Sequence, residues 1–545
     1  MVINKIKQLT DNQKISVFAA VLIFAFVLCF LGSELYINQF LDYSADSDNA
    51  SELILANLLF QEKSILSVNW YYSTELRVLN TNLIFAPLFY FFTDWHMVRM
   101  VGTVIIHIIM LVSCYILCDK LGCRKMFPLA GIMLIMPLSY DYYNVVLRFP
   151  YYAPHISITF ITLALMGYYA EQHSRLSDIL ILGSCFFLAL LAGLGGARQV
   201  IVCFLPLFIC ACLLILPDIK TTLFADRNCF QARVLFFSFL CIVGCGAGYL
   251  INTRVLSSIY HFRVYDVHLT PFNIDNLKLF ARSIPVVFGY REGLMKPSIA
   301  FHTCAAYTLP LISAVAAARG LFRKKHANRL YRYLSMFYLC SIGVLLLLYG
   351  FSDMTFERRY LLPTTVIAYP LIACFIADLS HHKKWLSAAV YAIVFAVSLG
   401  SGYCYYADRP FPSVKSDHQM IEEALMKKGY HYGYSTFWNA NVLTELSDGA
   451  IEMHNFDYMI TQAEGDINRS APWLQLVKHD TEIPEGKVFL LFQKDEISAN
   501  LDHSSDNNNL WKLTDDHIFY TVNDYVVYAY DSYTEMINEI YGKTG

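Results

Sequence analysis

The chain has 545 residues, of which 56% are hydrophobic and only 16% are charged, and its formal net charge is −3. A soluble chain of this length needs more charge to cover its surface, so the composition excludes an ordinary soluble protein and indicates a membrane protein. The charge is unevenly divided. Residues 1–404 hold 31 Lys and Arg against 21 Asp and Glu, whereas residues 405–545 hold 10 against 23. We therefore expect a net-basic membrane part followed by a net-acidic soluble part.

Eleven apolar runs predict membrane-spanning helices, because a hydrocarbon core about 30 Å thick takes roughly 20 helical residues. The third run is short and contains Pro128 and Pro137. The first run has the basic start of a signal peptide, but it is long and lacks a clear small-residue cleavage site, so we expect a retained anchor. The predicted spans are 15–33, 97–118, 125–140, 151–170, 178–197, 199–216, 233–251, 298–318, 333–351, 360–378 and 385–404.

Basic residues in short loops predict the orientation in the membrane. Residues 319–332 hold six Lys and Arg, and the basic loops 119–125 and 381–384 agree with them. Counting spans from these loops places the N-terminus in the cytoplasm and residues 405–545 outside it, in a multi-pass protein of the plasma (inner) membrane. Residues 81–92 are apolar and aromatic but too short to cross, so we expect them to lie along the outer interface.

The first outer loop, residues 34–96, begins with a cluster of carboxylates. Four acids fall within eleven positions: Asp42, Asp46, Asp48 and Glu52. An amphipathic helical pattern follows at once, with apolar residues at Leu53, Leu55, Ala56 and Leu59. A run of acids is most often a solvated surface, and that interpretation stays open. The place beside a membrane helix and the elaborate continuation of the loop favour a functional segment instead.

This arrangement resembles the GT-C superfamily of polytopic membrane glycosyltransferases. Protein O-mannosyltransferases and lipid A aminoarabinose transferases belong to it. In the family, a large loop after the first helix begins with an essential acid in a pattern like D-E-x-x-Y-A-x-I-A-R-x-L. Here "DNASELILANLL" begins at Asp48 and has Ala56 at the second alanine of the pattern, but Asn49 and Asn57 replace its second acid and its arginine. The aromatic "NWYYSTEL" and the later "APLF" are also similar to family segments.

The resemblance implies a fold of about 11 spans with a GT-C-like first loop, and a transferase that uses a polyprenyl-phosphate sugar. Such a transfer needs a carboxylate to deprotonate or orient the acceptor hydroxyl. We assign Asp48 as this base and Asp46 as a second carboxylate. Asp141 lies where the family often has another acid, although it also fits a simple turn residue. Glu75 and Glu357 are weaker candidates. The sequence leaves open whether a divalent cation takes part.

Arginines on the predicted outer face are few, and they are the candidates for binding the lipid phosphate. Guanidinium groups match phosphate oxygens in a bidentate way. An Arg-Tyr pair such as the one in "FERRYLLP" also resembles the lipid-phosphate site of the family. The alternative is that these arginines contact lipid headgroups at the interface. The predicted phosphate-binding residues are Arg358, Arg359, Arg148, Arg198, His155 and Tyr360. We expect His96 and His107 to be packing or interfacial residues.

The tail, residues 405–545, mixes helix and strand signals. "HQMIEEALMKKG" predicts a short helix that ends at Gly429, and "GKVFLLFQ" and "YVVYAYD" predict strands, the second in a hairpin around Asn523 and Asp524. We therefore expect residues 1–404 to form the membrane module and residues 405–545 a small extracytoplasmic α/β domain. "YGYSTFWNANVLTELSDG" fits a core strand plus a turn, and its aromatics and amides leave a glycan-binding role open.

Several other classes of protein are disfavoured. "GLGGARQ" lacks the strand and the downstream acid of a dinucleotide loop, so we expect its glycines to allow close helix packing. Phosphate-loop, zinc-protease and C-x-x-C motifs are absent, and all fifteen cysteines lie at or before Cys404, so we expect no disulfide. The sequence predicts an outer-face glycosyltransferase that modifies a cell-surface glycan, lipid or polymer, with the lipid bilayer and no nucleic acid as partner. A polysaccharide polymerase or ligase, a transporter and a non-catalytic scaffold remain as alternatives.

Overall fold

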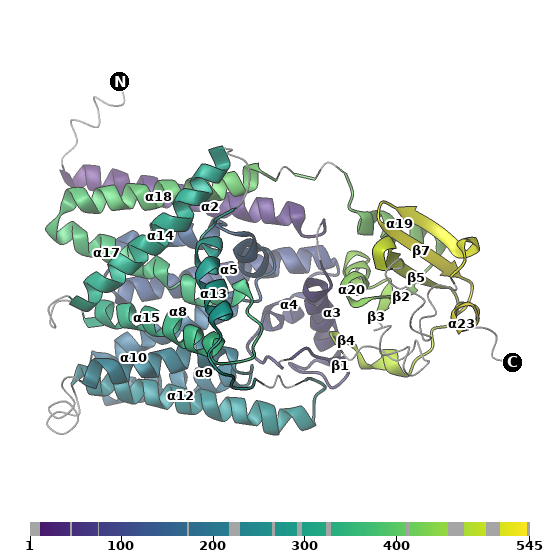
Figure 1. Cartoon of the computed structure of the whole chain (residues 1–545), viewed down its shortest axis with the longest axis horizontal. Coiled ribbons are helices and arrows are strands. Elements are labelled where there is room, and N and C mark those ends of the chain that lie inside the picture. The colour runs from purple at the N-terminus through teal and green to yellow at the C-terminus, as the bar shows by residue number, and fades with distance from the viewer. Residues whose placement is uncertain are drawn as a thin grey trace. The chain divides into compact units, whose positions relative to one another are not determined.

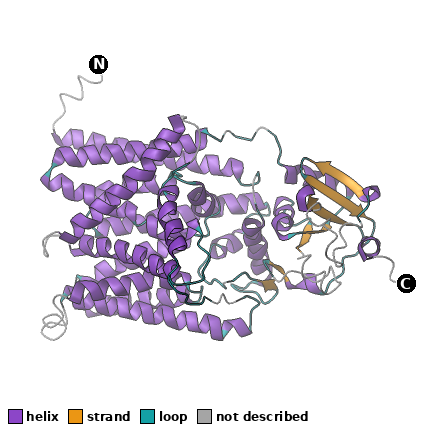
Figure 2. Ribbon diagram, in the orientation of Figure 1, coloured by secondary structure: helices purple, strands orange, loops and turns teal. Residues whose placement is uncertain are grey.

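The computed structural model describes residues 11–43, 46–74, 76–171, 174–216, 229–263, 267–291, 297–322, 329–409, 411–412, 414–455, 473–496 and 513–541 (Figures 1 and 2). Contacts within the chain divide it into two compact units. Unit 1 comprises Met1–Ile37, Thr103–Asn252 and Asp266–Pro410. Unit 2 comprises Asn38–Gly102, Thr253–Tyr265 and Phe411–Gly545. Glu75, one of the weaker candidate acids, lies outside the described residues.

Unit 1 is built from apolar helices, which Figure 2 shows in purple. In the described part of the chain, eight helices are long and apolar enough to span a membrane. They confirm a helical, multi-pass membrane protein. These helices are Ala19–Phe40 within α2 (Asp11–Phe40), α5 (Trp95–Lys120), α9 (Arg175–Gly193), Phe230–Ser258 around α12 (Phe230–Arg254), α14 (Pro297–Phe322), α15 (Arg329–Gly350), Arg358–His382, which ends in α17 (Ala368–His382), and α18 (Lys384–Ala407).

The other three predicted spans are also helical, but they are shorter or less apolar. They are α6 (Phe127–Ile135), α8 (Ala153–Ala170) and Val200–Ile215, which joins the π-helix η3 (Val200–Phe204) to α10 (Leu205–Ile215). Helix α6 ends where Met136 adopts an extended conformation, with ψ of 125°, because the residue before a proline is forced out of the helical region. The eleven predicted spans therefore all have a helical counterpart, and their number stays a prediction.

Helix packing in unit 1 depends on glycine at one crossing. A Cβ on Gly193 of α9 would lie 2.1 Å from the carbonyl oxygen of Cys245, and a Cβ on Gly248 of α12 would lie 2.1 Å from that of Leu190. The two helices can approach this closely because glycine has no side chain. Gly193 begins "GLGGARQ", so the predicted packing role of a glycine in that stretch is confirmed. Elsewhere in unit 1, α14 packs against α15, α17 and α18.

Unit 2 contains a five-stranded sheet, the larger group of orange arrows in Figure 2. Its strand order is β3-β2-β5-β7-β6. The neighbours of β2 run parallel to it, and β7 is antiparallel to both of its neighbours. The strands are β2 (Tyr432–Ser435), β3 (Glu452–Asn455), β5 (Val488–Gln493), β6 (Ile518–Val522) and β7 (Tyr525–Tyr530), and the helices α19 (Asp417–Lys428) and α23 (Tyr533–Tyr541) belong to the same part of the chain.

The predicted tail elements are largely confirmed. The strands at "GKVFLLFQ" and "YVVYAYD" are β5 and β7, and the hairpin turns at Asn523, whose φ is 48°. Helix α19 ends at Gly429, whose φ of 76° suits a residue without a side chain. The prediction of a strand plus a turn in residues 432–449 is wrong in its second half, because α20 (Phe437–Leu446) is a helix. The asparagines of this stretch are typical of a loop sequence, but tertiary contacts bury them in the folded chain. In one such contact, the backbone N–H of Asn441 donates to Ser47 Oγ at 3.1 Å.

The first predicted outer loop belongs to unit 2 together with the tail. Strand β1 (Trp70–Tyr71) pairs antiparallel with β4 (Gln475–Leu476), and α3 (Ser47–Glu62) packs against α20 and α4 (Asn82–Leu88). The amphipathic pattern is confirmed, since Leu53, Leu55, Ala56 and Leu59 are all buried. The predicted interfacial segment contains α4, a helix of seven residues. The division of the chain at residue 404 stays a prediction.

Candidate active site

Two arginines and three tyrosines of unit 1 meet in one cluster. The Cζ of Arg198 lies 4.7 Å from the ring centroid of Tyr152 and 6.0 Å from that of Tyr360. The Cζ of Arg359 lies 5.9 Å from the Tyr360 ring, and its side chain is hydrogen-bonded to Tyr151. The rings of Tyr151 and Tyr152 are 5.1 Å apart. We call these five residues the first arginine cluster, and it brings together three residues of the predicted phosphate-binding set.

Local sequence explains how Arg359 and Tyr360 are presented. They lie in η6 (Arg358–Leu361), a single 3₁₀ turn that follows the extended residue Glu357. Pro363 stands in the first turn of the next helix, α16 (Leu362–Thr365), where its fixed φ fits and its missing N–H costs nothing. The turn therefore begins a predominantly buried apolar segment, Arg358–His382. Arg358 itself is exposed, whereas Arg359 and Tyr360 are half-buried.

Two π-helical turns lie next to the predicted arginines. Such turns make up well under 1% of residues in proteins and often mark functional sites. The first, η2 (Tyr143–Arg148), ends at Arg148, and the second, η3, begins two residues after Arg198. Arg148 is only 4% exposed, and its Cζ lies 4.3 Å from the ring centroid of Phe149.

His155 lies in the first turn of α8 and is buried. Its Nδ1 is 2.9 Å from Nε2 of Gln199, and the same amide nitrogen donates to the His155 carbonyl oxygen at 3.1 Å. Gln199 is the neighbour of Arg198 in the chain, so this pair of contacts fixes the segment that carries Arg198. The structure thus gives His155 a role in positioning that segment.

Asp141 lies in unit 1, as does the weaker candidate Glu357. Asp141 belongs to α7 (Tyr140–Tyr142), whose first turn is capped by Ser139 Oγ, which accepts from the Tyr142 N–H. Burial raises the pKa of Asp141, and the nearby Arg358 and Arg359 guanidiniums lower it, while Glu357 raises it further. A carboxylate with a raised pKa is a better proton acceptor than an ordinary aspartate. Asp141 is therefore electrostatically coupled to the η6 turn.

Asp46 and Asp48 lie in unit 2, at the start of α3. Asp46 is the N-cap residue, and its carboxylate accepts from the backbone N–H of Asn49 at 3.0 Å. Asp48 stands in the first helical turn, where a negative charge is favoured by the helix dipole, and it is half-buried. Both positions are thus explained locally by helix chemistry, and their predicted catalytic roles stay predictions.

A buried ion pair that the sequence did not reveal fixes the start of α3. Arg99, in α5, donates from Nη2 to Glu445 Oε2 at 2.9 Å and also to the carbonyl oxygen of Asn49 at 2.8 Å. Its Nε donates to the other carboxylate oxygen. Arg99 is 1% exposed and Glu445 is 7% exposed. Nothing in the local sequence signals this pair, because its members are 346 positions apart.

The two histidines expected to be packing or interfacial residues both contact acids. His107 is fully buried, with Nδ1 2.6 Å from Glu34 Oε1 and Nε2 3.2 Å from the carbonyl oxygen of Val146 in η2. His96 lies 2.9 Å from Asp42. His107 therefore supports the π-helical turn that ends at Arg148.

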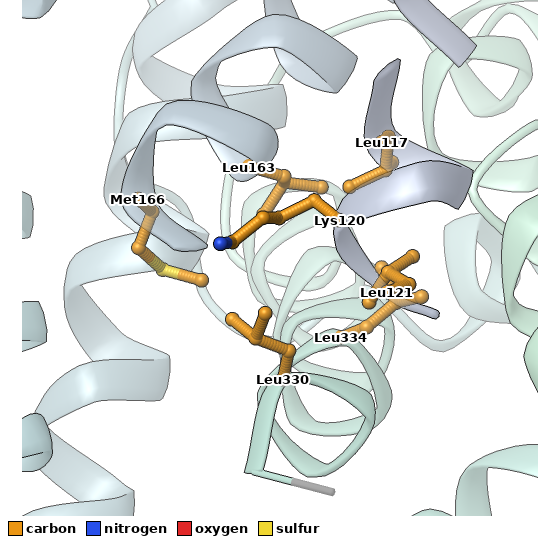
Figure 3. Close-up of a pocket in the computed structure, with 7 residues that line it drawn as sticks. All are labelled: Leu117, Lys120, Leu121, Leu163, Met166, Leu330 and Leu334. Carbon is orange, nitrogen blue, oxygen red and sulfur yellow. The ribbon is translucent and has the colours of Figure 1, made fainter. Parts of the chain in front are cut away.

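Among the described residues, no group of three or more His, Cys, Asp or Glu side chains could hold a metal ion. Figure 3 shows a pocket of unit 1 lined by Lys120 and six apolar side chains, which come from α5, from Leu121 directly after it, and from α8 and α15. Its free volume is about 10 Å³, which is room for roughly one water molecule. Lys120 also pairs with Glu171. None of the predicted site residues lines this pocket.

No protein-family model matches the chain, and no curated protein matches it. Among solved structures, the chain is similar to the oligosaccharyltransferase AglB from Archaeoglobus fulgidus in complex with an inhibitory peptide and a dolichol-phosphate. The TM-score is 0.46, with 10% identity over 78% of this chain and 64% of that one. It is also similar to ArnT from Cupriavidus metallidurans bound to undecaprenyl phosphate, with a TM-score of 0.41 and 12% identity over 93% of this chain and 98% of that one.

Both structures are less than 25% identical to this chain and have TM-scores below 0.5, so the resemblance to the GT-C superfamily stays a prediction from the sequence. The chain spans 64% of the length of the archaeal oligosaccharyltransferase. At these TM-scores and identities the likeness concerns general architecture, and no ligand or residue role is taken from it.

Proposed function

We propose that the chain is an integral membrane glycosyltransferase that transfers a sugar from a polyprenyl-phosphate donor to a cell-surface glycan, lipid or polymer on the outer face of the membrane. The observation that carries this function is the first arginine cluster. Its guanidiniums lie at the ends of apolar helices, where a lipid tail can stay among hydrophobic side chains while its phosphate meets positive charge.

The chemistry of the cluster suits a phosphate leaving group. When the bond between the sugar and the phosphate breaks, the electron pair stays on the phosphate oxygen, and cations nearby stabilise that charge. Arg359 has a buried Nε with no hydrogen-bond partner among the described residues. Since a buried unsatisfied donor is costly, an oxyanion that accepts from it would be favoured. Arg198 faces the same ring, Tyr360, from another part of the chain.

The acceptor hydroxyl must lose its proton as its oxygen forms the new bond to the sugar. A single carboxylate suffices for a direct displacement, because the leaving phosphate needs little protonation. We propose Asp48 as this base, from the resemblance of its segment to the GT-C motif. Asp141 is the second candidate, because its raised pKa and its coupling to Arg358 and Arg359 place a proton acceptor beside cationic groups.

The function is tested by sugar transfer in proteoliposomes, with radiolabelled polyprenyl-phosphate sugars and a cell-envelope extract as acceptor. We expect transfer by the native chain, a loss of at least about a hundredfold in Asp48→Asn, and an increase in donor KM in Arg359→Gln. Arg124→Gln is the control, because Arg124 also lies over a tyrosine ring but its side chain is 65% exposed. Equal transfer by Asp48→Asn and the native chain would move the base to Asp141. Unchanged donor KM in Arg359→Gln would remove the first arginine cluster from donor binding.

A further inference from the structure

A second group of arginines and tyrosines lies in unit 1, and the sequence-based prediction overlooked most of it. Arg409 follows α18, and its Cζ lies 4.4 Å from the ring centroid of Tyr405 and 5.1 Å from that of Tyr140. Arg291 faces Tyr405 as well, with its Cζ 4.8 Å from that ring. Two guanidiniums therefore share one buried tyrosine, which is 0% exposed.

Arg148 joins this group through two further tyrosines. Arg148 and Arg409 each interact electrostatically with both Tyr36 and Tyr143. The ring of Tyr143 lies 5.1 Å from that of Tyr405 and 6.2 Å from that of Tyr36, so the aromatic rings are continuous. The second arginine cluster is thus Arg148, Arg291 and Arg409 around Tyr36, Tyr140, Tyr143 and Tyr405.

Arg291 and Arg409 place two positive charges beside the ring of Tyr405. Asp408 lies 3.5 Å from Nη1 of Arg291. Guanidiniums that face the same rings repel one another unless an anion lies between them. The pairing with Asp408 also leaves the other terminal nitrogen of Arg291 available.

Two buried nitrogens at this place have no hydrogen-bond partner among the described residues. One is Nη2 of Arg291 and the other is Nε2 of His302. His302 is 0% exposed, its Nδ1 is 2.7 Å from Ser401 Oγ, and it interacts electrostatically with Arg291, Asp408 and Arg409. A buried donor without a partner costs roughly 1–3 kcal/mol, so a bound acceptor that satisfies it is favoured.

We propose that the second arginine cluster is an oxyanion-binding site that takes a phosphate group, separate from the phosphate held by the first arginine cluster. It differs from an arginine that contacts lipid headgroups at the membrane interface, because Arg148 is almost fully buried and Tyr405 is completely so. This identification of the ligand rests on the proposed function. If the chain is such a glycosyltransferase, its reaction involves two anionic groups. They are the phosphate of the donor and a second phosphate carried either by the donor as a diphosphate or by the acceptor.

The test is equilibrium binding to the full chain, purified in phospholipid-free detergent, of inorganic phosphate, a short-chain polyprenyl phosphate and the corresponding diphosphate. We expect Arg291→Gln to weaken the binding of inorganic phosphate or of the diphosphate by about ten- to a hundredfold. Arg291→Lys should restore part of that affinity. The matched control is Arg124→Gln, since Arg124 lies 5.3 Å from a tyrosine ring and 3.8 Å from Asp119 but is exposed. Arg124→Gln should bind as the native chain does.

The probes distinguish the two sources of the phosphate. A loss in Arg291→Gln that is confined to the diphosphate supports a second phosphate on the donor, and a loss confined to inorganic phosphate supports an acceptor phosphate. Unchanged binding of all three probes in Arg291→Gln and in Arg409→Gln, both folded by size-exclusion chromatography, would overturn the site. The proposed function fails separately, by unchanged polyprenyl-phosphate binding in Arg359→Gln, so one failure cannot be taken for the other.

Discussion

Arg99 and Glu445 form a buried two-point ion pair, in which Nε and Nη2 of the arginine donate to the two carboxylate oxygens. Because Nη2 also donates to the carbonyl oxygen of Asn49, the same guanidinium holds the first turn of α3 against α20. This first turn contains Asp48, the proposed base. The pair therefore connects the geometry of a candidate catalytic residue to the C-terminal part of the chain.

We predict that Arg99→Leu destabilises the protein by about 3–5 kcal/mol, because it leaves the Glu445 carboxylate buried without its partner. The double variant Arg99→Leu with Glu445→Leu should recover most of that loss, since removing both charges leaves nothing unpaired. Chemical unfolding of the purified chain, followed by tryptophan fluorescence, measures both. Additive losses in the double variant would contradict the pairing.

A second prediction separates helix capping from catalysis at the start of α3. Asp46→Ser should keep the helix intact, because serine caps as well as aspartate, whereas Asp46→Ala should lose about 1 kcal/mol. If Asp46 acts only as the cap, Asp46→Ser also keeps the transfer activity that Asp48→Asn loses. The measurement is stability and proteoliposome transfer on the same three variants. A stable but inactive Asp46→Ser would show instead that the carboxylate itself takes part in the reaction.

The segment that begins with these acids shows which features of the fold the sequence could predict and which it could not. The spacing of the apolar residues Leu53, Leu55, Ala56 and Leu59 was sufficient to predict the helix α3, since helical periodicity is a local property of the sequence. Arg99 and Glu445 were missed because an ion pair between distant segments has no local signal. The helix α20 was missed for the same reason, because its buried asparagines find their partners only in the folded chain.

The arginines give a sharper example. Adjacency of arginine and tyrosine at the end of an apolar run singled out Arg359 and Tyr360, and the structure does bring them together with Arg198. The same signal stands at Tyr290 and Arg291, where it was not used, whereas Tyr405 and Arg409 are four positions apart. What the sequence could not give is the grouping of these arginines into two clusters, because each cluster combines segments far apart in the chain.

A third prediction concerns the pH dependence of transfer if Asp141 is the base. A base must be ionised to accept a proton, and burial raises the pKa of Asp141. The pH profile of kcat/KM should therefore have a rising limb whose midpoint lies above the ordinary pKa range of aspartate. Arg358→Gln removes a cation that lowers this pKa and should move the limb to higher pH. Glu357→Gln removes a neighbouring acid that raises it and should move the limb to lower pH. Shifts in the same direction in the two variants would rule out Asp141 as the source of the limb.

The last prediction tests the close approach of α9 and α12, which holds the segment that leads to Arg198. In Gly193→Ala, the new methyl group would lie 2.1 Å from the carbonyl oxygen of Cys245, and backbone cannot give way as a flexible side chain can. We expect a loss of about 1–3 kcal/mol from overpacking. Gly183 lies on the same helix with nothing within 4 Å of an added Cβ, so Gly183→Ala should be neutral or slightly stabilising. Thermal unfolding of the two variants in the same detergent decides the matter, because equal midpoints would mean that the two helices can separate at no cost.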